Sequence, residues 1–150
     1  RDRATEDGRL IELTYDWYAQ DRRGRVWYLG EATTSYDNGQ TSTQGSWQAG
    51  VDGARAGVVM FGRGRLDAPY WQEYLAGEAE DQGVLLDRRA RVALRGGDYG
   101  RVRLTKDITP LEPEIMELKF YAPGVGLVLE VGTSPELGRV ALVRMSRPRG

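Results

Sequence analysis

Hydrophobic and polar residues alternate with a period of two along most of this chain, whereas the 3.6-residue period of an amphipathic helix is nearly absent. In residues 10–20, one set of alternate positions is apolar or aromatic: Ile11, Leu13, Tyr15, Trp17 and Ala19. The other set is polar: Glu12, Thr14, Asp16, Tyr18 and Gln20. This segment is therefore predicted to be a strand with one dry and one wet face.

Further strands are expected at short intervals, separated by residues that favour turns. Residues 21–24 and the Asn38–Gly39 pair predict hairpins, because Gly and Asn tolerate the positive φ of tight turns. The other predicted strands are 25–31, 58–61, 70–80, 84–94, 99–106, 116–121, 125–131 and 139–145. Of these, 70–80 has an acidic end that is expected to be a loop, and 84–94 is either one long strand or a pair of strands. Loops are expected at 44–57, 62–68 and 134–138, and two prolines make 109–113 a rigid connection. We expect an all-β fold and a single domain over residues 1–150, in which an antiparallel meander forms a barrel or a strongly rolled sheet.

Composition narrows the chemistry that this chain can perform. Its 150 residues carry a formal net charge of −1, and no apolar run reaches the ~18 residues that a membrane span needs. The near-neutral charge argues against a nucleic-acid partner, which favours a basic patch. There is no His and no Cys, which excludes histidine bases, thiol nucleophiles, disulfides and ordinary zinc or copper sites. No cofactor is predicted.

The aromatic residues favour a ligand pocket. Eight Tyr and four Trp stand against two Phe, and Tyr and Trp suit half-wet surfaces because each carries a polar group beside its ring. The predicted ligand-binding aromatics are Tyr18, Trp27, Trp47, Trp71, Tyr74 and Tyr121. The expected ligand is a small amphipathic molecule or a carbohydrate.

A pair of carboxylates is the catalytic device that remains when His and Cys are absent. One carboxyl is kept protonated by an apolar setting and the other is ionised, which is the chemistry of glycoside hydrolysis. Carboxylates next to aromatic residues are Asp16, Glu31, Glu73 and Glu117. The predicted catalytic pair is Glu73 with Asp16 or Glu117. The alternative for each is a solvated strand position, because 22 acidic residues make chance adjacency common.

Other chemistry-bearing residues have simpler interpretations. The acidic residues at 78–81 lack the spacing of a calcium loop, so they predict a solvated loop and no metal site. Ser46 and Ser134 have no His partner for a catalytic triad. Lys106 or Lys119 would form a Schiff base only if burial depressed its pKa. For Lys119, an ion pair with Glu117 is the simpler interpretation.

Several motifs in order resemble an uncharacterised family of secreted or lipid-anchored bacterial β-rich proteins. They are DWYAQD at 16–21, VWYLGE at 26–31, GSWQAGVDGA at 45–54, QEY at 72–74, GEAED at 77–81, TPLEP at 109–113 and FYAPGVGLV at 120–128. The resemblance covers the chain to about Val131. It implies an extracytoplasmic β domain, secreted or in the cell envelope, and it implies no activity or catalytic residue.

The chain resembles that family without an N-terminal portion that its relatives carry, which holds the first strands. A sheet that lacks those strands would expose two edges, and exposed edges pair with other chains. A homodimer or a domain-swapped assembly is therefore expected.

Two functions remain open from the sequence. The first is a noncatalytic module that binds a small amphipathic or carbohydrate ligand in the concave face of the sheet. The second is a carboxylate-based hydrolase, which requires two carboxyl groups ~5–10 Å apart across one pocket. An envelope-structural protein without a ligand is a third interpretation.

Overall fold

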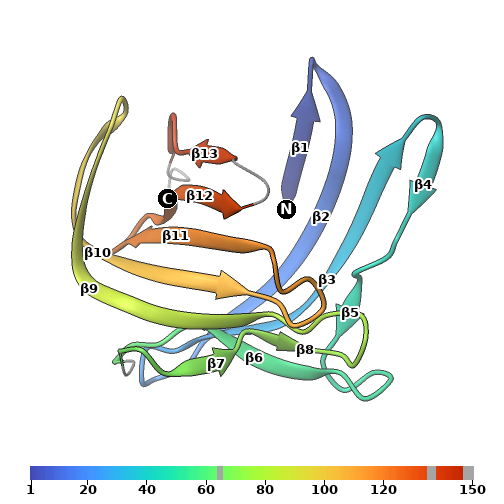
Figure 1. The fold of residues 1–150 in the computed structure, drawn as a ribbon, viewed down its shortest axis with the longest axis horizontal. Helices are drawn as coiled ribbons and strands as arrows, with labels where there is room; N and C mark the ends of the chain where they lie inside the picture. The colour runs from blue at the N-terminus through green and yellow to red at the C-terminus, as the bar shows by residue number, and fades with distance from the viewer. Residues whose placement is uncertain (64–65, 135–137, 147–150) are drawn as a thin grey trace. The chain divides into compact units, whose positions relative to one another are not determined.

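The protein is built from β-strands alone in the residues that the computed structural model describes, 1–63, 66–134 and 138–146 (Figure 1). The strands pair in an antiparallel manner, which confirms the all-β prediction. They form two sheets, and no closed barrel is found within the described ranges. The described part of the chain also contains no helix long and apolar enough to span a membrane.

Contacts within the chain group it into two compact units, which are described separately. The first unit comprises residues within 1–64 and 70–82, and the second comprises residues within 65–69 and 83–150.

The first unit contains one antiparallel sheet whose strands differ in length. Its principal strands, in spatial order, are β1 (Asp2–Glu6), β2 (Arg9–Gln20), β3 (Val26–Asp37), β6 (Arg55–Met60) and β8 (Glu73–Tyr74). Two short strands, β4 (Gln40–Ser42) and β5 (Trp47–Gln48), also pair with β3. The predicted hairpins are confirmed, since Gly24, Asn38 and Gly39 have φ of 77°, 47° and 82°.

A β-bulge interrupts the pairing of β2 with β3. Tyr18 lies opposite Tyr28, but Trp17 lies opposite Gly30, so Leu29 is an extra residue on β3. Gly30 has a φ of 148°, and a Cβ atom there would lie 2.6 Å from the backbone oxygen of Trp47. The bulge therefore depends on glycine at this position.

The middle of β2 differs from the predicted dry and wet sets. Tyr15 and Trp17 are 46% and 45% exposed, whereas Thr14 is 6% exposed. The hydroxyl of Thr14 lies 2.7 Å from that of Thr33 on β3, so its burial leaves no polar group unsatisfied. Trp17 instead lies over Gly30, where no side chain competes for the space.

The second unit contains the other sheet. In spatial order its strands are β13 (Arg139–Ala141), β12 (Gly126–Ser134), β11 (Met116–Ala122), β10 (Gly97–Ile108), β9 (Gln82–Leu94) and β7 (Pro69–Trp71), the last lying where the chain passes between the units. Val92, Val102, Ala122 and Val128 form its apolar core. The tip of the β9–β10 hairpin reaches the C-terminal segment, because a Cβ on Gly96 would lie 3.0 Å from the backbone oxygen of Val143.

Some predicted elements differ from the structure. β1 is an additional strand that was not predicted, and an Asp7–Gly8 turn joins it to β2. Residues 70–80 hold only short strands, because Leu75 and Ala79 close a tight turn. The last strand ends at Ala141. The loops predicted at 62–68 and 134–138 fall partly outside the described residues, at 64–65 and 135–137.

Candidate functional site

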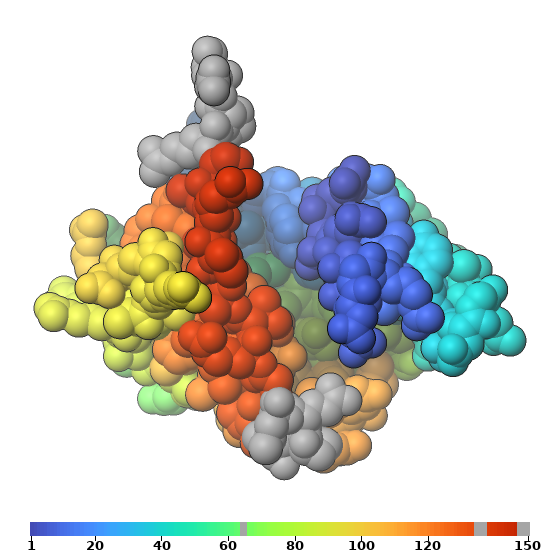
Figure 2. Space-filling view, turned by 90° about the horizontal axis from the view of Figure 1, so that it is seen from above, coloured from blue at the N-terminus to red at the C-terminus, as the bar shows by residue number. Residues whose placement is uncertain are grey.

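A polar hollow of about 350 Å³ lies on the face of β1, β2 and β3 that holds Thr14. Four carboxylates line it, from Asp2, Glu12, Asp16 and Glu31. The rest of the lining is Thr14, Thr33, Ser35, Gln44 and Gly45. No lysine or arginine contributes to this lining among the described residues. Figure 2 shows the hairpins that border it, β1–β2 in blue and β3–β4 in cyan, side by side.

The β-bulge brings these side chains to one face. Beyond it, three pairs lie directly opposite each other across β2 and β3: Asp16 and Glu31, Thr14 and Thr33, Glu12 and Ser35. Alternation along an unbulged β3 would place Glu31, Thr33 and Ser35 on the face opposite to that of Tyr28. The extra residue Leu29 shifts the alternation, so that Tyr28 and Glu31 share a face with Asp16.

Tyr28 connects the two central carboxylates. Its hydroxyl oxygen lies 2.8 Å from Asp16 Oδ1 and 2.9 Å from Glu31 Oε2. Those two carboxyl oxygens are therefore within about 6 Å of each other, close to the separation in retaining glycosidases. A phenol has one proton to donate. Both contacts are full hydrogen bonds only when one of the two carboxyl groups carries a proton.

The electrostatics of the site favour Glu31 as the protonated group. Burial raises the pKa of Glu31 above 4.5, and the charge of Asp16 raises it further, although the hydrogen bond from Tyr28 acts in the opposite direction. Burial, together with Tyr18 and Glu31, raises the pKa of Tyr28 well above 10.0, so the phenol stays protonated. Asp16, Tyr28 and Glu31 thus form one coupled group.

Hydrogen bonds behind the hollow fix its shape. Ser46 Oγ donates to the backbone oxygen of Thr33 at 3.2 Å and accepts from the backbone N–H of Thr33 at 3.0 Å. These bonds hold the 44–46 segment against β3, and Gln44 and Gly45 of that segment line the hollow. Hydrogen bonds between the Ser46 side chain and the backbone of β3 therefore support this part of the lining.

An exposed aromatic ring lies next to the coupled group. Tyr18 is 52% exposed and stacks on Tyr28, with ring centroids 4.7 Å apart and an interplanar angle of 17°. Trp47 supports Tyr28 from another side in an edge-to-face contact at 5.2 Å. Tyr28 thus holds the ring of Tyr18 in place, and part of the surface of the Tyr18 ring is accessible to solvent.

Glu73 and Glu117, the other two carboxylates named for the predicted catalytic pair, lie in other settings. Glu73 is buried in the first unit, where its Oε2 accepts a 2.6 Å hydrogen bond from the indole N–H of Trp47. Glu117 lies in the second unit, 3.1 Å from the Lys119 ammonium, and this agrees with the predicted ion pair. Glu31, which the sequence named only as a carboxylate beside Trp27, is the one that shares Tyr28 with Asp16.

The predicted aromatic residues are spread over both units. Of the six, Tyr18 adjoins the hollow. Trp27 donates to Asp21 in the β2–β3 turn, where the Arg25 guanidinium lies 4.9 Å from its ring. Trp47 is a core residue. Trp71 contacts Tyr74 edge to face, and the Arg55 guanidinium lies over the Tyr74 ring. Tyr121 belongs to the second unit and lies near Lys119.

Lys119 is unsuited to Schiff-base chemistry. Burial alone would lower its pKa, but the carboxylates of Asp107, Glu117 and Glu130 outweigh burial and raise the pKa of Lys119 above its usual 10.5. Their oxygens lie 3.1–3.8 Å from the ammonium. A lysine held in its charged form is a poor nucleophile.

Neither the acidic hollow nor the acidic turn at 77–80 has the geometry of a cation site in the described residues. In the described ranges, no group of three or more carboxylates has the arrangement needed to hold a metal ion. In the turn at 77–80, Glu80 accepts a hydrogen bond from the backbone N–H of Gly77 at 2.9 Å, which gives that carboxylate a structural role.

Comparisons with known proteins identify no relative: the chain matches no protein-family model, no curated protein and no solved structure.

Proposed function

We propose that the first unit binds a carbohydrate in the hollow between β1, β2 and β3. The observation that carries this proposal is a row of carboxylates and hydroxyls that ends at an exposed, stacked tyrosine. Carboxylates accept hydrogen bonds from sugar hydroxyls, and the face of an aromatic ring packs against the apolar face of a pyranose. A volume of about 350 Å³ is within the range of small-ligand sites.

The charge of the lining narrows the class of sugar. Four carboxylates with no lysine or arginine among the described lining residues would repel uronic acids and sulfated sugars. A neutral sugar or an amino sugar, whose ammonium these carboxylates attract, is the expected ligand. The polar lining also disfavours the amphipathic ligand considered from the sequence. An extracytoplasmic location, supported by the resemblance to secreted proteins, is part of the proposal.

A glycan array tests this proposal with wild type, Asp16→Asn and Glu6→Gln. Asp16→Asn is expected to weaken binding to the best neutral or amino glycan at least tenfold, because a hydrogen bond to a charged group contributes about 1.5–3 kcal/mol. Glu6→Gln removes a carboxylate of β1 that does not line the hollow, and it should bind as wild type does. Absence of any glycan ligand, or equal binding by Asp16→Asn and wild type, would contradict the proposal.

A retaining glycoside hydrolase is the second candidate, favoured by the short separation of Asp16 and Glu31. In that mechanism Glu31, with its raised pKa, would protonate the leaving group and Asp16 would attack the anomeric carbon. The array proteins and Glu31→Gln are therefore also assayed on chromogenic glycosides. Turnover that both Asp16→Asn and Glu31→Gln abolish would make the site catalytic, and binding without turnover would support the binding module.

A further inference from the structure

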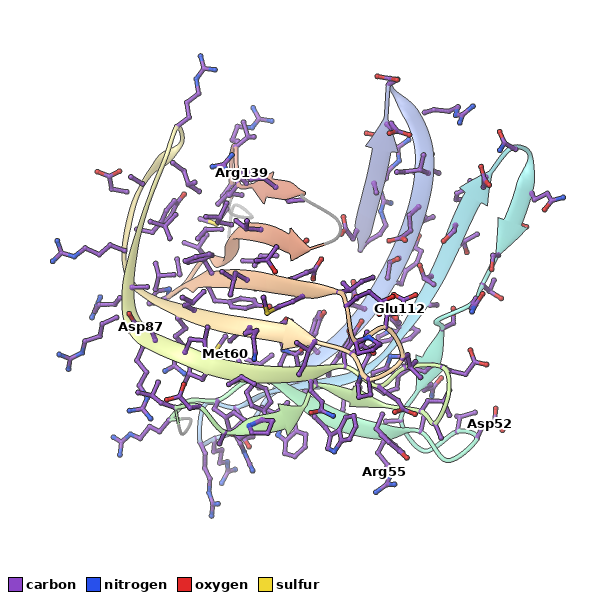
Figure 3. The ribbon with its side chains drawn as sticks, in the orientation of Figure 1. Asp52, Arg55, Met60, Asp87, Glu112 and Arg139 are labelled. Carbon is purple, nitrogen blue, oxygen red and sulfur yellow. The ribbon has the colours of Figure 1, made fainter. Side chains whose placement is uncertain are left out.

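The second unit has a hollow of about 270 Å³ with a basic lining. Arg88 and Arg89 of β9 and Arg101 and Arg103 of β10 line it, together with Pro123 from the β11–β12 turn. No acidic residue contributes to this lining within the described ranges. Asp87, labelled on β9 in Figure 3, instead accepts a 2.7 Å hydrogen bond from the backbone N–H of Arg89.

Local charge at this hairpin differs from that of the whole chain. Residues 87–103 contain six arginines and two aspartates, with no lysine or glutamate, in a protein whose formal net charge is −1. The concentration of arginine is therefore local. It produces a positive potential at the hollow that a near-neutral protein would otherwise lack.

Arg101 has an unusual backbone conformation. Five described non-glycine residues have positive φ, and four of them are Asp or Asn, which adopt this conformation with little cost. The fifth is Arg101, with a φ of 54° inside β10. A long, charged side chain at a position that glycine or asparagine would occupy more easily indicates a role other than stability.

We propose that this hollow binds a phosphate or sulfate group of a small ligand or of a lipid headgroup. The planar guanidinium group donates paired hydrogen bonds that match the oxygens of a tetrahedral oxyanion. Several arginines around one small hollow can contact such a group from different sides. This inference concerns the second unit and does not depend on the carbohydrate site.

Pyrophosphate, titrated calorimetrically at constant ionic strength, is the first probe. The test variant is Arg89→Gln with Arg101→Asn, since asparagine tolerates the backbone conformation at 101 and Arg88 and Arg103 have further interactions in the protein. The control, Arg91→Gln with Arg95→Gln, removes the same charge from exposed positions of the same hairpin that do not line the hollow. A thermal melt of each variant checks folding.

Saturable 1:1 binding of pyrophosphate is expected, at least tenfold weaker in the test variant and changed less than threefold in the control. Phosphatidylglycerol and phosphatidylcholine vesicles distinguish the source of the group. If the protein does not bind pyrophosphate but binds phosphatidylglycerol vesicles, and this binding is lost in the Arg89→Gln, Arg101→Asn variant, the bound phosphate belongs to a lipid headgroup. That result would also support the site. Equal losses of affinity in the test and control variants would show that the anion is attracted by diffuse positive charge, which would overturn the proposal. The absence of binding to both pyrophosphate and vesicles would also overturn it.

Discussion

Gly30→Ala is expected to lower the free energy of unfolding by about 2–4 kcal/mol, because the new methyl group would meet backbone atoms at the bulge. The new Cβ would lie 2.6 Å from the Trp47 backbone oxygen and 2.9 Å from Gln48 Cα, and backbone atoms cannot move aside as a flexible side chain can. The φ of 148° adds a conformational cost for any residue with a Cβ. Chemical denaturation measures the loss.

Gly53→Ala is the matched control for this substitution. Gly53 also has a positive φ, 85°, but a Cβ there would meet nothing within 4 Å. Its loss should be about 1 kcal/mol, the conformational cost alone. If the two variants lose the same stability, the close approach of β5 to the bulge is not what requires glycine at position 30.

Lys119→Met is expected to destabilise the protein by about 3–5 kcal/mol at neutral pH, as removal of one partner from a buried ion pair does. Asp107 is 6% exposed, and the ammonium of Lys119 lies between it and the carboxylates of Glu117 and Glu130. Methionine fills a similar volume, so the loss would report charge and not a cavity. Urea denaturation at pH 7 measures it.

The pH dependence identifies the cause of this loss. The raised pKa of Lys119 contributes stability that is fully present below its usual 10.5 and is lost as the pH rises past that value, so the deficit of Lys119→Met should shrink as the pH is raised above 10.5. Lys106→Met, on β10, is the control, because the described residues provide no ion pair to Lys106, and it should cost less than about 1 kcal/mol. A Lys119→Met protein within 1 kcal/mol of wild type at pH 7 would contradict this electrostatic role.

Period-two alternation predicted most strands of this protein, because local pattern and turn residues act over short distances. Examples are the hairpins at Gly24 and Asn38–Gly39 and the strands β10 and β11. The division into two sheets depends on which strands pair, and alternation carries no information on that. The strand β1 had a local indicator, the Asp7–Gly8 turn, that the sequence analysis did not use.

The candidate site was predicted only in part, for a physical reason. The alternation in residues 10–20 grouped Glu12, Thr14, Asp16 and Tyr18, and these four side chains do share a face of β2. That face was predicted to be solvated, but it is the more buried of the two around Thr14. The partners on β3 could not be found in this way, because a one-residue bulge moves Glu31 and Thr33 to the other face. Gly30 was the only local indicator, and the close contact that explains it involves β5.

A carbon-13 NMR titration of the Glu31 carboxyl reports on the coupling of Asp16, Tyr28 and Glu31. We predict a pKa above 4.5 in wild type that falls towards 4.5 in Asp16→Asn, because the charge of Asp16 contributes to the rise. A carboxyl whose pKa is raised by folding costs stability as the pH rises through that pKa, so Glu31→Gln should gain stability relative to wild type from about pH 4.5 upward. A Glu31 pKa at or below 4.5, or one that Asp16→Asn leaves unchanged, would show that the two carboxyl groups are not coupled through this site.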